Sequence, residues 1–120
     1  MIKKIKTLKY GSWESPVKAS LIAEGTPRNP LSEIIIDNNI IYWIESRPKE
    51  NGRNVIVMKQ NDNPPQDILP KHFNARNSVH EYGGGVYSVK NGIIYFTNWD
   101  DQRIYKIQNN EIKPITPKSQ

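Results

Sequence analysis

The residues whose types most suggest chemistry are His80-Glu81, which are followed by Tyr82 and a run of glycines. A zinc-peptidase motif begins with the same pair, but it needs a second histidine four positions after the first, on a helix, so that both rings face one metal ion. Gly84 occupies that position, and a glycine run disfavours a helix. His72 is the other histidine. We therefore expect no metal site and no cofactor, and we expect His80 and Glu81 to anchor a loop by hydrogen bonds.

The run Gly83-Gly84-Gly85 allows two interpretations. Successive backbone amides can hold an anion, but phosphate-binding loops of this kind continue into a helix whose N-terminus adds its dipole. A strand pattern follows these glycines instead. We therefore favour close packing of the backbone as the reason for three glycines.

Four arginines stand at predicted strand ends and loops, beside acidic residues: Arg47, Arg53, Arg76 and Arg103. We expect them to form ion pairs between neighbouring sheets. Recognition of a peptide carboxylate by one of them is the alternative, and no spacing selects which one. The tryptophans Trp13, Trp43 and Trp99 are interpreted as packing anchors rather than stacking platforms.

Composition limits the classes of protein to which the chain can belong. Its 120 residues carry a net charge of +5, and 36% are hydrophobic, which suits one small domain without a large single core. No apolar run is long enough to span a membrane, and the basic start lacks the apolar stretch of a signal peptide. The absence of cysteine excludes disulfides and thiolate chemistry. We expect a soluble, cytoplasmic protein.

Residues 1–30 are predicted to form an N-terminal segment with one short helix. Ser15 can accept a hydrogen bond from the free amides at a helix start, and Pro16 suits the first helical position. A short apolar edge follows, and Gly25 is placed to end the helix.

From residue 31 the pattern changes to strands, in two groups of four. Apolar runs are separated by clusters of Asn, Asp, Gly and Pro. The first group is expected at 31–36, 40–44, 55–58 and 68–69, and the second at 85–89, 93–97, 103–107 and 112–115. Asn91-Gly92 is typical of a two-residue hairpin turn.

The two groups form an internal repeat. Asn38 and the run Ile40-Ile41-Tyr42 recur 53 positions later as Asn91 and Ile93-Ile94-Tyr95. Four short strands in a unit of about fifty residues are typical of a β-propeller blade. The predicted fold class is therefore all-β, with two four-stranded antiparallel propeller blades and a short N-terminal helix.

The predicted domain organisation follows from this repeat. One blade occupies residues 31–70, a connecting loop 71–84, the second blade 85–117 and a tail 118–120. Complete propellers have four to eight blades, so two blades leave apolar faces exposed. We therefore expect further blades from a longer protein, or association between copies of the chain.

Six segments of the chain stand in the same order as the landmarks of a known family: Tyr10–Pro16, Trp43–Pro48, Gly52-Arg53, Phe73–Arg76, Val79–Gly85 and Asp101–Tyr105. Together they resemble the N-terminal propeller region of prolyl oligopeptidase family serine peptidases, in the acylaminoacyl-peptidase or dipeptidyl-aminopeptidase-like branch. The segment with His-Glu-Tyr-Gly-Gly-Gly is the most specific. The resemblance spans nearly the whole chain.

The resemblance implies an enzyme of two parts, in which the propeller admits short or unfolded peptides to a C-terminal α/β-hydrolase domain. That domain would supply the catalytic Ser, Asp and His. This chain contains no Gly-x-Ser-x-Gly motif, so we expect no catalytic residue in it and no peptidase activity from it alone. Its implied role is to select substrates and to dock the hydrolase domain.

Within that role, five residues are candidates for the substrate channel or the domain interface: His80, Glu81, Tyr82, Arg47 and Arg103. Two other functions stay open. Copies of the chain could pair their open blades to form a self-assembling binding protein. The positive charge, with four lysines among the first nine residues, also fits a small nucleic-acid-binding domain.

Overall fold

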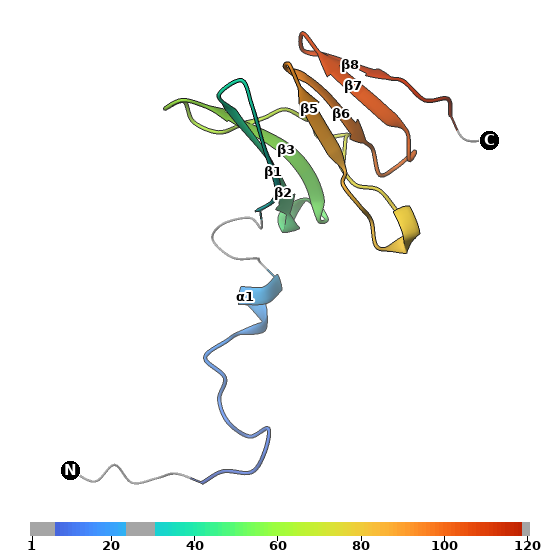
Figure 1. The fold of residues 1–120 in the computed structure, drawn as a ribbon. Helices are drawn as coiled ribbons and strands as arrows, with labels where there is room; N and C mark the ends of the chain where they lie inside the picture. The colour runs from blue at the N-terminus through green and yellow to red at the C-terminus, as the bar shows by residue number, and fades with distance from the viewer. Residues whose placement is uncertain (1–6, 24–30, 119–120) are drawn as a thin grey trace.

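Two four-stranded antiparallel sheets form the body of the computed structural model, which describes residues 7–23 and 31–118 (Figure 1). The first sheet has the order β1 (Leu31–Asp37), β2 (Ile40–Arg47), β3 (Arg53–Gln60) and β4 (Gln66–Asp67). The second has the order β5 (Tyr87–Lys90), β6 (Ile93–Thr97), β7 (Ile104–Gln108) and β8 (Glu111–Pro114). The sheets lie side by side, with β1 against β5.

This arrangement confirms the predicted all-β class and both groups of strands. In each sheet the strand order follows the chain and every neighbouring pair is antiparallel, as in a propeller blade. β4 does not overlap the strand predicted for this position: it covers Gln66–Asp67 rather than residues 68–69. The amide of Ile68 still donates to the carbonyl oxygen of Ile56 at 2.8 Å, so the edge pairing continues beyond the regular strand.

The N-terminal helix is shorter than predicted. The hydroxyl of Ser15 accepts a hydrogen bond from the amide of Val17 at 3.1 Å, yet this bond closes a local turn and α1 spans only Ala19–Ala23. Gly25, the predicted end, lies outside the described residues. A helix of one turn gains little from its own hydrogen bonds, and the side chain of Leu21 is exposed. No helix within the described residues is long and apolar enough to cross a membrane.

Three hairpins reverse through two residues with positive φ. Asn91 and Gly92 have φ values of 51° and 73°, which confirms the predicted turn, and Asn38-Asn39 and Asn109-Asn110 share this conformation. Such turns match the right-handed twist of the paired strands, and asparagine and glycine adopt positive φ most readily.

The core lies between the two sheets. On β2 and β3, the buried Tyr42 and Ile44 stand opposite Met58 and Ile56, so these side chains share one face of the first sheet. The second sheet contributes Ile94, Phe96 and Ile107 to the same cluster. Phe73, in the connection between the sheets, adds edge-on ring contacts to Phe96 and Tyr105. One continuous apolar core therefore joins the repeats.

Polar contacts along β1 and β5 fix the inner edges of the sheets. Glu33 accepts a hydrogen bond from the amide of Val86 at 3.0 Å through its carboxylate, and its carbonyl oxygen accepts one from the Tyr87 hydroxyl at 2.5 Å. The carboxylate of Asp37 accepts hydrogen bonds from the amides of Asn91 and Gly92, at 3.1 and 2.8 Å. Acidic side chains of the first repeat thus hold backbone amides of the second.

The expected ion pairs between sheets are absent from the described part of the chain. Arg47 pairs with Glu45 and Asp67, and Arg53 with Glu50, all within the first repeat. That prediction was wrong because the two sheets are joined by side-chain bonds to backbone amides. A buried amide must find a partner, whereas an exposed ion pair contributes little.

The core predicts the effect of two neighbouring substitutions in β6. Phe96 is 1% exposed and Tyr95, on the opposite face, is 36% exposed. We expect Phe96→Ala to lower the free energy of unfolding by about 3–5 kcal/mol, because it removes a buried ring and leaves a cavity. Tyr95→Ala should cost less than half as much in the same urea titration. Equal losses would contradict the placement of the core.

The contact between β1 and β5 predicts that the folded chain loses stability at alkaline pH, where Tyr87 ionises. Burial, together with the charge of Glu33, raises the pKa of Tyr87 to about 12. An unfolded tyrosine has a pKa of about 10, so this group's stabilisation is complete below about pH 10 and is lost as the pH rises to about 12. Urea unfolding at a series of pH values should show a shallower alkaline loss in Tyr87→Phe. Tyr82→Phe, at an exposed side chain, should keep the wild-type dependence, and an unchanged slope in Tyr87→Phe would contradict the assignment.

Candidate site at the loop edge of the two sheets

Three connections meet at the end of the sheets opposite the hairpin turns (Figure 1). They are the β2–β3 loop with the 3-10 turn η1 (Pro48–Glu50), the long link between the sheets, and the β6–β7 turn. The link runs between β3 and β6: the amide of Ala75 donates to the carbonyl oxygen of Asn54, and that of Arg76 to the carbonyl oxygen of Thr97, at 3.0 and 3.1 Å. The link therefore extends both sheets at this edge.

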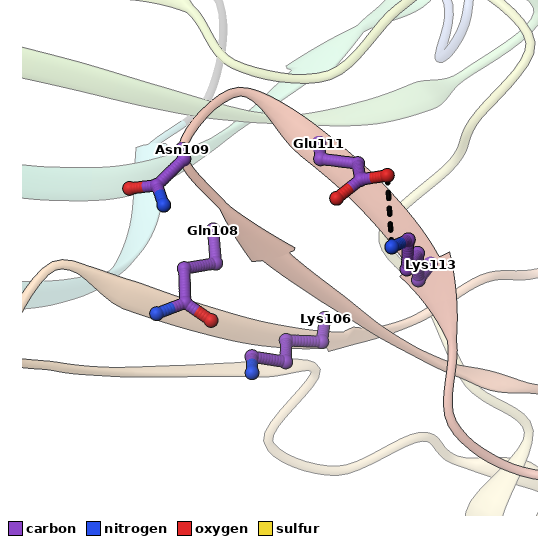
Figure 2. Close-up of a pocket in the computed structure, with 5 residues that line it drawn as sticks. All are labelled: Lys106, Gln108, Asn109, Glu111 and Lys113. Carbon is purple, nitrogen blue, oxygen red and sulfur yellow. Dashed lines mark ion pairs between the residues drawn. The ribbon is translucent and has the colours of Figure 1, made fainter.

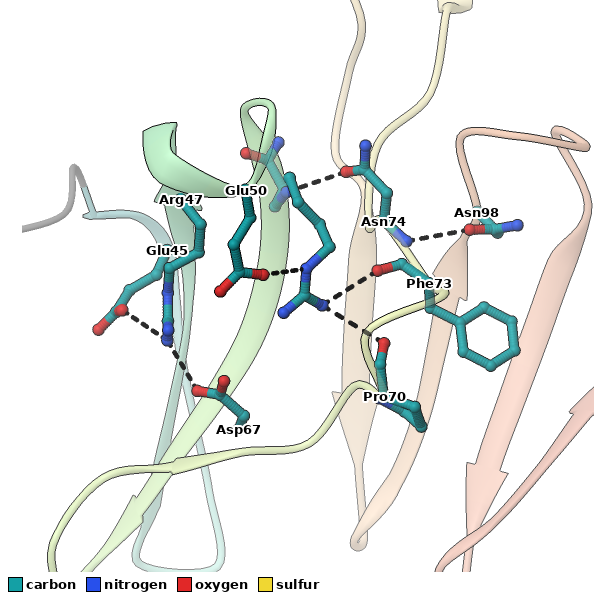
Figure 3. A network of polar contacts seen from close by, with 10 residues as sticks. Glu45, Arg47, Glu50, Asp67, Pro70, Phe73, Asn74 and Asn98 are labelled. Atoms are coloured by element: carbon teal, nitrogen blue, oxygen red, sulfur yellow. Dashed lines mark hydrogen bonds and ion pairs between the residues drawn. The ribbon is translucent and has the colours of Figure 1, made fainter. Parts of the chain in front are cut away.

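Asparagine side chains connect the three segments. The side-chain oxygen of Asn74 accepts a hydrogen bond from the amide of Asn54 at 2.9 Å, and the amide of Asn74 donates to the side-chain oxygen of Asn98 at 3.1 Å (Figure 3). Asn98 is buried. Each bond satisfies a backbone amide that the ladders leave unpaired, so the link has one fixed position between the sheets.

Arg53 is a structural cation at this edge. Its guanidinium is nearly buried, contacts Glu50 at 2.7 Å and donates to the carbonyl oxygens of Pro70 and Phe73 at 3.3 and 3.2 Å (Figure 3). The hydrogen bond and charge of Arg53 hold the pKa of Glu50 below its usual value, against the effect of burial. Because its Nε and Nη1 donors are occupied and its charge is paired with Glu50, Arg53 fixes the link.

Asp101 organises the β6–β7 turn. Its carboxylate accepts hydrogen bonds from the Tyr105 hydroxyl at 2.6 Å, the Asn98 side chain at 3.0 Å and the Arg103 amide at 3.2 Å. Burial opposes its ionisation, but these bonds and the charge of Arg103 outweigh burial and lower the pKa of Asp101. The bond to Asp101, together with burial, raises the pKa of Tyr105.

The two candidate arginines are both engaged. Arg47 contacts Glu45 at 2.9 Å and Asp67 at 2.7 Å. Arg103 donates to the carbonyl oxygen of Thr116 at 2.9 Å, and its guanidinium lies 5.8 Å from the centroid of the Tyr105 ring. Both side chains therefore support the local structure of their own sheet.

His80, Glu81 and Tyr82 lie together on the link, in and after the 3-10 turn η2 (Val79–Glu81). All three are exposed. His80 and Glu81 have positive φ values of 52° and 65°, which are uncommon for such residues. Among the described residues, no hydrogen bond or ion pair joins these side chains to Arg47 or Arg103, so the structure does not gather the five candidates into one site.

The loop is anchored by Asn77, not by the side chains of His80 and Glu81 as predicted. Asn77 is buried; its side chain donates to the carbonyl oxygen of Gly85 and accepts from the amides of Val79 and Gly84, at 3.1, 3.2 and 3.0 Å. One amide side chain can close such a loop because it carries both donors and acceptors. No sequence signal distinguishes Asn77 from its neighbouring asparagines.

The packing interpretation holds for one of the three glycines. Gly83 has a φ of +80°, and a Cβ atom there would lie 3.3 Å from the carbonyl oxygen of Asn77. At Gly84 and Gly85 an added Cβ would meet nothing within 4 Å. Only the first glycine is therefore required by a close approach and a left-handed backbone.

Hollows lie at the loop edge and on the outer strands of the second sheet. At the loop edge, η1, the link and the β6–β7 turn enclose a cleft of about 370 Å³ whose lining includes Lys71, His72, Arg76 and Trp99. At the outer strands of the second sheet, a smaller hollow of about 140 Å³ lies beside the Glu111–Lys113 ion pair, whose side chains Figure 2 shows. The described residues contain no group of three or more His, Asp or Glu side chains placed to hold a metal ion.

Two solved structures of known proteins align with nearly the whole of this chain. No protein-family model matches the chain, and no curated protein matches it. The solved structure of a puromycin hydrolase aligns with 94% of this chain at 30% identity and a TM-score of 0.75. A puromycin-hydrolyzing peptidase of Mycobacterium tuberculosis aligns with 92% at 33% identity and the same TM-score. The chain spans 18% of the length of each.

The fold resembles the N-terminal propeller region of a prolyl oligopeptidase family peptidase. This likeness agrees with the family resemblance of the sequence motifs and with the propeller-like pair of sheets. Both neighbours are hydrolases by name, and both are far longer than this chain.

The Asp101 hydrogen bonds predict an acid-dependent loss of stability. We expect Asp101→Asn to lower the free energy of unfolding at pH 7 by about 1–3 kcal/mol, because an amide accepts fewer and weaker bonds than a carboxylate. The folded pKa lies below the unfolded value of about 4, so this stabilisation is present above about pH 4 and is lost as the pH falls further. Chemical unfolding between acidic and neutral pH should show the difference from wild type shrinking in acid. Asp100→Asn is the control, and an equal effect there would refute the assignment.

Proposed function

We propose that this chain is part of the N-terminal propeller of a prolyl oligopeptidase family serine peptidase of the acylaminoacyl-peptidase or dipeptidyl-aminopeptidase-like branch. In this proposal the chain is not catalytic. It restricts access of peptides to an α/β-hydrolase domain and docks to that domain. The whole enzyme would act on small aminoacyl compounds, as the names of the two puromycin-hydrolysing neighbours suggest.

The observation that carries this proposal is the extent of the likeness. More than nine-tenths of the chain aligns at 30–33% identity with segments that are only 18% of each hydrolase. Function does not follow from a propeller fold alone, because propellers serve many functions. The identity over the aligned length, in addition to the fold, makes a peptidase propeller the best-supported function.

The internal repeat supports the presence of a further blade. Tyr42 and Ile56 on the first sheet are 3% and 0% exposed, because the second sheet covers them. The register of the strands makes Tyr95 and Ile104 their equivalents on the second sheet, where they are 36% and 37% exposed. These two side chains and Thr97 line a hollow of about 210 Å³. A third sheet packed as the second packs on the first would cover that face.

The exposed side chains on the link fit the proposed contact with substrate or hydrolase domain. Tyr82 is fully exposed and stands beside His80 and Glu81, whose backbone is held in an uncommon conformation. Such strain persists only where the surrounding structure supports it, and it is concentrated at functional sites. Arg47 and Arg103, which are engaged within their own sheets, are weaker candidates.

A chimera tests the proposal. The segment of puromycin hydrolase that corresponds to this chain is replaced by residues 1–120, and hydrolysis of puromycin is measured. We expect the chimera to be active and to be blocked by a serine-directed inhibitor, and the isolated chain to be inactive. Tyr95→Lys in the chimera should lower kcat/KM by at least about tenfold, because it places a charge where the next blade packs. Tyr10→Lys, which makes the same change at a fully exposed side chain outside both sheets, is the matched control.

Three outcomes would contradict the proposal. A folded chimera without activity would refute the peptidase propeller, and inhibitor-sensitive hydrolysis by the isolated chain would refute the non-catalytic role. Light scattering of the isolated chain addresses the self-assembling alternative. A monodisperse multimer that Tyr95→Lys dissociates would favour a binding protein built from copies of this chain.

A further inference from the structure

Among the four arginines that the structure describes, one has a guanidinium without an ion pair or a hydrogen bond to another described residue. Arg47 and Arg53 are in ion pairs, and Arg103 is bonded to a carbonyl oxygen. The guanidinium of Arg76 lies over the ring of Trp99, 4.4 Å from its centroid, and contacts no carboxylate or carbonyl oxygen within the described part of the chain. The residue is exposed, so solvent or a ligand can reach its side chain.

Arg76 lines the cleft of about 370 Å³ at the loop edge, together with Lys71, His72 and Asn51. Two acidic residues also line it. The carboxylate of Glu50 is already held by Arg53 at 2.7 Å, which leaves Asp100 as the other acid. Lys71 forms no ion pair within the described residues. The cleft therefore presents two cations that form no ion pair within the described residues.

The backbone beneath these side chains is fixed. The amide of Arg76 donates to the carbonyl oxygen of Thr97 at 3.1 Å. The amide of Trp99 donates to the carbonyl oxygen of Asn74 at 2.9 Å. Arg53 holds the start of the link through the carbonyl oxygens of Pro70 and Phe73. A ligand that enters the cleft does not have to order its walls, which lowers the entropic cost of binding.

The geometry favours a carboxylate over a nucleic acid. A guanidinium offers parallel N–H donors that match the two oxygens of a carboxylate, and stacking on an indole ring leaves these in-plane donors free. Single-stranded nucleic acid is bound through open aromatic faces on which bases stack. In this cleft Arg76 already covers a face of Trp99.

We propose that this cleft binds the carboxylate of a peptide, with Arg76 as its bidentate partner and Lys71 as a second cation. The carboxylate belongs to the peptide's C-terminus or to an acidic side chain. The inference rests on the proposed function only in the choice of a peptide as the carrier of the carboxylate. Its test is a direct binding measurement without peptidase activity, so the two can fail separately.

The test uses the full chain labelled with ¹⁵N and follows the indole N–H signal of Trp99. Short alanine-based peptides are added in three forms: with a free C-terminal carboxylate, with an amidated end and internal glutamates, and amidated without acidic residues. We expect at least one carboxylate form to shift the Trp99 signal in a saturable manner, and the neutral form not to. The two acidic forms distinguish the sources of the carboxylate.

Substitutions test whether Arg76 is the residue that binds the carboxylate. Arg76→Gln should raise Kd by at least about tenfold, as expected for loss of a bidentate charged pair, and Arg76→Lys should raise it less. Lys90→Gln makes the same change of charge on β5, away from the cleft, and should alter Kd by less than about twofold at matched ionic strength. If Arg76→Gln unfolds the chain, Lys71→Gln provides the test.

Several results would overturn the inference. These are equal shifts by the neutral peptide, equal effects of Arg76→Gln and Lys90→Gln, or no shift with any peptide. Saturable binding of an oligothymidylate in place of the peptides would assign the cleft to nucleic acid instead.

Discussion

Burial of one face of each sheet against the next sheet is the constraint on which the rest of the structure depends. The face that carries Tyr42 and Ile56 is covered because Ile94, Phe96 and Ile107 pack against it. A four-stranded sheet of short strands has no core of its own, so it needs such a neighbour. The same requirement explains why the equivalent face of the second sheet leaves Tyr95 and Ile104 exposed.

Polar contacts give this apolar packing its alignment. At the inner edge, Glu33 and Asp37 bind backbone amides of the second repeat. At the loop edge, Asn74 and Asn98 bind amides of the link. Apolar packing is non-directional, whereas a hydrogen bond to one amide is satisfied at one register only. The two kinds of contact therefore have different tasks: burial holds the sheets together, and amide acceptors determine how they are placed.

Most of the fold could be predicted from the sequence, because its signals are local. Apolar runs separated by Asn, Gly and Pro mark the strands, and Asn91-Gly92 marks a hairpin without reference to anything distant. The positions that determine the candidate site were not predictable in this way. Asn77 and Asn74 act on segments brought near by folding. Arg76 carries no ion pair because Glu45, Asp67 and Glu50 pair with Arg47 and Arg53, and the fold determines those pairings.

The bonds of Asp37 have a consequence for the order in which the chain acquires its structure. The β5–β6 hairpin reverses at Asn91-Gly92, and both amides of that turn are held by the carboxylate of Asp37, at the end of β1. During synthesis the N-terminal repeat emerges first. It can therefore serve as a template on which the later hairpin closes, so that each sheet guides the alignment of its successor.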